Sequence, residues 1–122
     1  MRPRHPALAA HGALSRGAFA VTVLVSLAVL FAPAGDVPSA PPGVDKLVHV
    51  LLFAALALSG RWAGMRARVL VAPLLSYAAV SEVVQGMSPL ARSASVADWV
   101  ADAVGVLAGL VLWARLAEPS RG

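Results

Sequence analysis

The sequence predicts an all-α protein: a small polytopic membrane bundle of four transmembrane helices with both termini in the cytoplasm. Of its 122 residues, 59% are hydrophobic and 13% are charged, about half the charged share of roughly 25% that is usual in soluble domains. Apolar runs recur four times: the first is long enough for a hydrocarbon core of about 30 Å, and the second spans about 27 Å at 1.5 Å per residue. Eight of the ten basic residues flank these runs on one face of the membrane, and the positive-inside rule places that face in the cytoplasm.

Composition also excludes several other classes of protein. The net charge of +4 invites comparison with nucleic-acid-binding proteins, but the arginines stand in short tracts beside apolar runs, without an aromatic-rich basic surface. We therefore expect no nucleic-acid partner, and we expect the membrane lipid bilayer to surround the chain. The absence of cysteine excludes disulfides, thiolate chemistry and cysteine-ligated metals.

The first expected span covers residues 14–33 and follows a cytoplasmic leader, residues 1–13. The basic leader, the apolar run and the Ala-Pro-Ala sequence at 32–34 imitate a secretory signal with its cleavage site. We expect the helix to be retained, because about 17 residues before the apolar run are long for a signal. Proline inside the cleavage sequence also makes it a poor site. The proline-rich segment 34–44 that follows is expected to be an extended outer loop.

The other three spans are expected at residues 45–62, 69–87 and 96–116, with a cytoplasmic tail at 117–122. Together with the first span they form one domain, residues 14–116. The fourth span carries a stripe of small residues at period four, which permits close packing of helices. The residues of this stripe are Ala97, Ala101, Gly105 and Gly109.

Polar residues gather where the spans meet the outer face. Asp45 with His49, and Asp98 with Asp102, are four residues apart and share a helix face, and Glu82 lies near the outer end of the third span. Ionisable residues at such depths are candidate functional residues. The predicted polar pocket consists of Asp45, Lys46, His49, Glu82, Gln85, Arg92, Asp98 and Asp102.

Each of these residues also has a structural interpretation. Asp45 and Asp98 are suited to capping their helices, and His49 to a single hydrogen bond with a carbonyl group. Glu82 should face Arg92, Lys46 or His49, either as a structural ion pair that holds three helices in register or as part of an active site. Asp98 and Asp102 are candidates for sharing a proton.

The order of these residues resembles a known family. Asp45-Lys46-Leu47-Val48-His49, Ser81-Glu82-Val83-Val84-Gln85, Arg92, and Ser95-Val96-Ala97-Asp98 followed by Gly105 and Gly109 are similar to the VanZ-like membrane domain. The resemblance covers residues 44–116 and implies a membrane bundle with a link to low-level resistance to the glycopeptide teicoplanin. Asp102 departs from the family, which usually has asparagine there. This adds a negative charge and removes an amide donor.

Two classes of function follow. The outer pocket is expected to bind or modulate a cell-envelope component, such as a lipid-linked cell-wall precursor, with Lys46 and Arg92 contacting its anionic groups. Alternatively, the chain is a small intramembrane enzyme that acts on a lipid headgroup, with His49 as general base or metal ligand beside the acidic residues. The sequence has no His-Glu-x-x-His motif and no second outer histidine, so we predict neither a metal nor a cofactor. A proton-coupled transporter is disfavoured, because four short spans show no inverted repeat.

Overall fold

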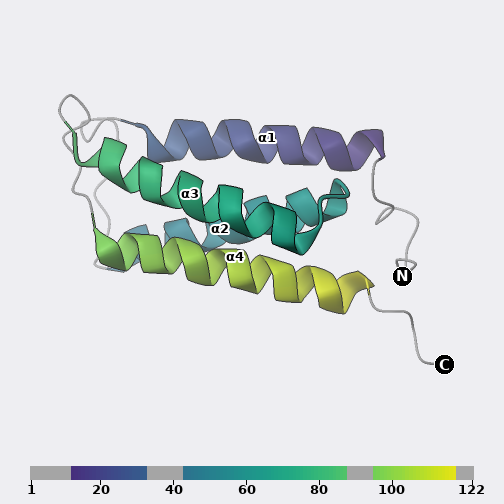
Figure 1. Ribbon diagram of the computed structural model, residues 1–122. Coiled ribbons are helices and arrows are strands. Elements are labelled where there is room, and N and C mark those ends of the chain that lie inside the picture. The colour runs from purple at the N-terminus through teal and green to yellow at the C-terminus, as the bar shows by residue number, and fades with distance from the viewer. Residues whose placement is uncertain (1–11, 33–42, 88–94, 118–122) are drawn as a thin grey trace.

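The computed structural model describes residues 12–32, 43–87 and 95–117, and these residues form four α-helices. The helices are α1 Ala13–Leu30, α2 Val44–Trp62, α3 Ala67–Gln85 and α4 Val96–Ala117. They lie side by side and alternate in direction, so that α1 begins and α4 ends at the same end of the bundle (Figure 1). The all-α prediction is confirmed.

Three of the helices, α1, α3 and α4, are long and apolar enough to cross a membrane. Their outward-facing side chains are apolar as well: Leu24, Val83 and Leu107 are 65%, 64% and 63% exposed. Soluble monomers rarely expose large continuous apolar surfaces. These helices therefore indicate a membrane protein.

Helix α2 has 19 residues but carries Asp45, Lys46 and Arg61 near its ends. By length and composition alone it is not among the helices that are apolar enough to cross a membrane. It contacts each of the other helices, and His49 and Phe53 are buried along it. The polar side chain of His49 is therefore covered by protein, whereas Asp45 and Lys46 are exposed. That α2 is a fourth span stays a prediction.

Two glycines set the distance between α2 and α4. A Cβ atom on Gly105 would meet the carbonyl oxygen of Val50, and one on Gly109 would meet that of Ala54. Larger side chains would therefore push α4 away from the α2 backbone. This agrees with a packing role for the stripe of small residues.

The stripe does not pack along its whole length. Ala101 is buried, whereas Ala97 is exposed. Residues four apart are rotated by about 40° around a helix with 3.6 residues per turn, so a stripe of period four winds away from the contact. Ala97 lies too far round α4 to face α2.

The core links α1, α2 and α3 through Tyr77. Its hydroxyl group and that of Ser26 share a hydrogen bond of 2.9 Å, and its ring packs against Phe31 and Phe53 with centroid distances of 6.4 and 5.7 Å. The fully buried Phe53 lies in the centre of this core. Tyr77 therefore joins the apolar interior to the polar groups of α1.

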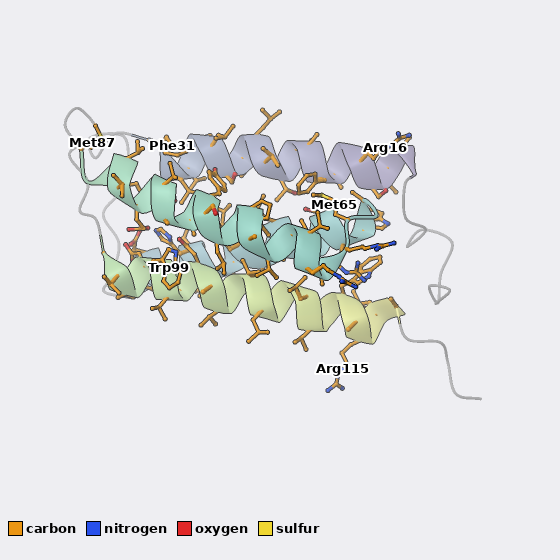
Figure 2. The ribbon with its side chains drawn as sticks, viewed as in Figure 1. Arg16, Phe31, Met65, Met87, Trp99 and Arg115 are labelled. Atoms are coloured by element: carbon orange, nitrogen blue, oxygen red, sulfur yellow. The ribbon has the colours of Figure 1, made fainter. Side chains whose placement is uncertain are left out.

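The two ends of the bundle differ in character. Arg16, Met65 and Arg115 lie at one end, which we call the basic end, and Phe31, Met87 and Trp99 lie toward the other (Figure 2). At that second end α1 and α3 finish and α2 and α4 begin. We call it the cluster end, because it brings together the polar residues of the candidate site.

We predict that Gly105→Ala destabilises the bundle by about 1–3 kcal/mol, the usual cost of overpacking a well-packed contact. The added methyl group would meet the Val50 carbonyl oxygen, which cannot move without the helix. Thermal unfolding in detergent measures the effect. Gly17→Ala is the matched control, because nothing lies within 4 Å of a Cβ there. Equal melting temperatures for the two variants would contradict the proposed close contact.

Candidate functional site

His49 is the centre of a cluster of charged residues at the cluster end. Helix α2 contributes Asp45 and Lys46 in its first turn, α3 contributes Glu82 in its last turn, and α4 contributes Asp98 and Asp102. Only 1% of His49 is exposed. The His49 cluster is defined by these residues: Asp45, Lys46, His49, Glu82, Asp98 and Asp102.

The shortest contact in the cluster joins His49 to Asp102. His49 Nδ1 and Asp102 Oδ1 share a buried hydrogen bond of 2.6 Å. With Asp102 ionised, its carboxylate only accepts hydrogen bonds and Nδ1–H is the donor. The bond fixes the orientation of the ring and leaves Nε2 with a lone pair whenever the histidine is neutral.

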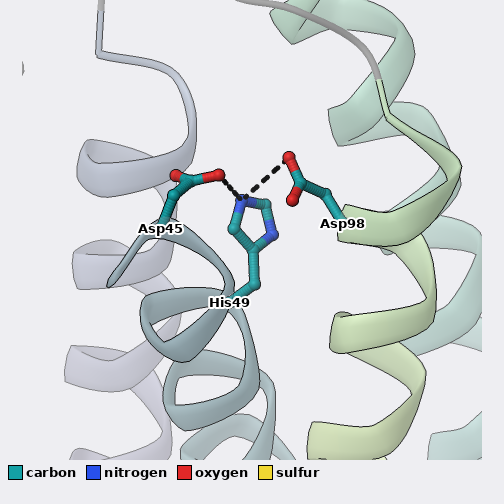
Figure 3. A group of neighbouring side chains, drawn as sticks. All are labelled: Asp45, His49 and Asp98. Atoms are coloured by element: carbon teal, nitrogen blue, oxygen red, sulfur yellow. Dashed lines mark ion pairs between the residues drawn. The ribbon is translucent and has the colours of Figure 1, made fainter. Parts of the chain in front are cut away.

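Nε2 faces two other carboxylates. It lies 3.8 Å from Asp45 Oδ2 and 3.9 Å from Asp98 Oδ2 (Figure 3), whereas Asp102 contacts the other ring nitrogen, Nδ1. Both distances exceed the 2.7–3.2 Å range typical of an N–H···O hydrogen bond. The Asp45 side chain is 55% exposed, so this side of His49 is the one nearer to the surface.

Asp98 also binds Lys46, whose Nζ donates to Asp98 Oδ1 over 3.1 Å. The capping role considered for Asp98 is filled by Ser95 instead, because the Asp98 N–H donates to Ser95 Oγ over 3.2 Å. On α2 the N-cap residue is Gly43, and Asp45 lies inside the first turn. Both aspartate side chains thus face His49.

Glu82 approaches His49 from α3. Its Oε2 accepts the backbone N–H of Ser95 over 3.1 Å, and its Oε1 lies 3.6 Å from His49 Nδ1. Of the three partners expected for Glu82, which were Arg92, Lys46 and His49, the structure places His49 beside it. Among the described residues, however, Oε1 has no hydrogen-bond partner, and the same holds for Oδ2 of the fully buried Asp102.

The cluster is therefore short of positive charge. Among the described residues it contains four carboxylates against one ammonium group, Lys46. A buried carboxylate is costly unless a cation or hydrogen bonds compensate it. The arrangement suits a cation or a transferable proton better than an isolated anion.

Of the predicted pocket residues that the structure describes, Gln85 stands apart from this cluster. Gln85 is buried, and its Nε2 donates to the carbonyl oxygen of Leu30 over 2.8 Å, so it joins α3 to the end of α1. Arg92, and with it the expected contact between Glu82 and Arg92, lies outside the described residues. Asp98 and Asp102, expected as partners that share a proton, have separate hydrogen-bond partners, Lys46 and His49.

A groove of about 320 Å³ opens between α3 and α4 beside the cluster. It is lined by Ala79, Glu82, Val83, Ser95, Val96 and Trp99. Trp99 Nε1 donates to the carbonyl oxygen of Leu75 over 3.3 Å, which ties the two helices together at this level. The groove thus has apolar walls, with Glu82 and Ser95 as polar groups.

Sequence reasoning missed the roles of Ser95 and Trp99 and the pairing of His49 with Asp102. Ser95 carried a signal, because serine followed three residues later by aspartate at the start of an apolar run is a helix N-terminus pattern. The His49 partner depends on the rotation of α2 against α4, which no spacing within one helix determines.

No protein-family model, curated protein or solved structure matches the chain.

We predict that His49 and Asp102 are energetically coupled by about 1.5–3 kcal/mol, the range for a hydrogen bond that involves a charged group. A double-mutant cycle of His49→Ala and Asp102→Ala, measured by equilibrium unfolding in detergent, gives the coupling. The control is a cycle of His49→Ala with Asp45→Ala, for which the exposed side chain predicts about 0.5 kcal/mol or less. Additive effects for His49 and Asp102 would show that the hydrogen bond does not form.

Proposed function

We propose that this chain is a four-span membrane protein that binds a lipid-linked component of the cell envelope at its outer face. In this proposal α2 is the fourth span, the cluster end faces outward and both termini are cytoplasmic. The basic end supports this orientation, because Arg16, Arg61 and Arg115 belong to it and basic residues favour the cytoplasmic side.

The observation that carries the proposal is the groove between α3 and α4. Lipid-facing helices form its sides, so a membrane lipid can enter it laterally without leaving the bilayer. Its apolar walls suit an acyl or polyprenyl chain, while Glu82 is shared between the groove and the His49 cluster. A lipid lying there would bring its headgroup to the cluster.

The His49 cluster indicates which chemical groups a bound headgroup would carry. Lys46 has a half-exposed side chain and is placed to meet a phosphate, as Arg92 is in the sequence-based interpretation. Binding of a cell-wall precursor in this way would change its presentation to glycopeptides. The VanZ-like resemblance and its link to teicoplanin susceptibility belong to this proposal.

A second function, lipid-headgroup hydrolysis, is favoured by the hydrogen bond between His49 and Asp102. A carboxylate that holds Nδ1–H leaves Nε2 to accept a proton from water, the role of a general base. Mass spectrometry of a lipid probe incubated with the protein separates this function from binding alone. Headgroup release that His49→Gln abolishes would establish hydrolysis, whereas an unchanged probe would exclude it for that lipid.

We predict that Ala79→Phe, which fills the groove, reduces retention of a polyprenyl phosphate several-fold. Ala72→Phe makes the same change at an exposed position of α3 that does not line the groove, and should leave retention unchanged. Native mass spectrometry of both variants in detergent, with phosphatidylglycerol as competitor, measures how much polyprenyl phosphate each variant retains. Equal retention by the two variants would remove the groove from the proposal. A teicoplanin-sensitive host expressing each variant tests the envelope link.

We predict that the cluster end is outside the cell. The chain has no cysteine, so any labelling by a thiol reagent comes from the introduced cysteine. A membrane-impermeant thiol reagent on intact cells should label Ser39→Cys and Ser93→Cys but not Ala63→Cys, because Ala63 follows α2 at the basic end. Permeabilised cells provide the control and should allow labelling at position 63. Labelling of Ala63→Cys in intact cells would reverse the orientation.

A further inference from the structure

The geometry points to a divalent metal site in the His49 cluster, with His49 Nε2, Asp45 Oδ2 and Asp98 Oδ2 as ligands. These atoms come from two helices and lie within 4.8 Å of one another. Figure 3 shows the two carboxylates directed at the same ring nitrogen. Imidazole and carboxylate together suit a first-row cation such as Mn²⁺ or Zn²⁺.

The distances are close to those of ligands around a shared ion. Nε2 lies 3.8 and 3.9 Å from the two oxygens, too far for hydrogen bonds. Metal–ligand bonds of about 2.1 Å at octahedral or tetrahedral angles separate neighbouring ligand atoms by about 3.0–3.4 Å. The two carboxylates would therefore close in on Nε2 by roughly half an ångström to bind a shared ion, and the exposed side of Asp45 leaves room for water ligands.

The other edge of the ring carries the support that a metal-binding histidine needs. Such histidines almost always donate their second N–H to a carboxylate or carbonyl, which fixes the tautomer and strengthens the ligand. Asp102 does this for His49 through the 2.6 Å hydrogen bond at Nδ1. The ring itself needs no reorientation before Nε2 can bind a metal.

An independent observation points to a cation in the cluster. Glu82 and Asp102 are 5% and 0% exposed, and each has a carboxylate oxygen without a hydrogen-bond partner among the described residues. The oxygen of Glu82 lies 3.6 Å from His49 Nδ1. A divalent ion bound to His49 would place positive charge beside these two buried carboxylates.

The inference goes beyond lipid binding and also deepens it, since a metal ion would let an acidic pocket accept a phosphate headgroup. Divalent cations commonly bridge protein carboxylates and phosphates. Metal binding itself is independent of the lipid proposal and can be measured without any lipid.

The test is titration of the purified full-length protein in detergent with Mn²⁺, followed by electron paramagnetic resonance and calorimetry, with Zn²⁺ as competitor. We expect one Mn²⁺ per chain, displaced by Zn²⁺. His49→Gln and Asp45→Asn should abolish this binding. Asp102→Asn should weaken it by about 10–100-fold, as loss of a supporting carboxylate does. Lys46→Met should strengthen it, because the ammonium group competes for Asp98.

Circular dichroism and melting temperature identify variants that do not fold, and the gain expected for Lys46→Met cannot arise from misfolding. The inference is overturned if the folded protein binds neither ion, if His49→Gln and Asp45→Asn bind as the original does, or if Lys46→Met binds more weakly. It is also overturned if Glu82→Gln loses the ion while Asp45→Asn keeps it, since the ion would then lie at Nδ1. Lipid retention measured in the same samples separates the two proposals: retention without metal leaves lipid binding intact.

Discussion

The close approach of α2 and α4 is the constraint on which the candidate site depends. Gly105 meets the α2 backbone at Val50, directly after His49, and Asp102 lies one turn before Gly105. The missing side chains at Gly105 and Gly109 bring the two backbones together, and the polar residues one turn nearer to the cluster end then come within hydrogen-bond distance. The small-residue packing common in membrane helices thus sets the distance between a histidine and its carboxylate.

Burial of these polar groups depends on partners that other helices supply. His49, Glu82 and Asp102 come from three different helices, and all are more than nine-tenths buried. Separated, each would carry a desolvation cost of several kcal/mol. Together with Lys46 they form a network at the end of the bundle, where the N-terminus of α4 and the backbone N–H of Ser95 offer further compensation.

Sequence predicted the helices well because membrane spans depend on local composition. Apolar length alone identified α1, α3 and α4, and the positions of Asp45 and His49 in the first turns of α2 followed from counting along one helix. Contacts between side chains on different helices were harder to predict from the sequence. Spacing along α4 suggested Asp98 and Asp102 as a pair. In the structure Asp98 accepts a hydrogen bond from Lys46, and Asp102 shares one with His49. That difference arises from the rotation of each helix about its axis, which depends on tertiary packing. Gln85 shows the same limit, since nothing local indicates that its partner is a carbonyl group on α1.

The hydrogen bond from Gln85 to Leu30 has a consequence for the integrity of the protein. With the Ser26–Tyr77 bond and the packing of Phe31 on Tyr77, it holds the C-terminal part of α1 to α3 without help from the covalent connection. A backbone break after residue 32 would leave these contacts in place. The first helix is therefore suited to complementation in trans, with residues 1–32 and 33–122 produced as two polypeptides that reassemble within one bilayer.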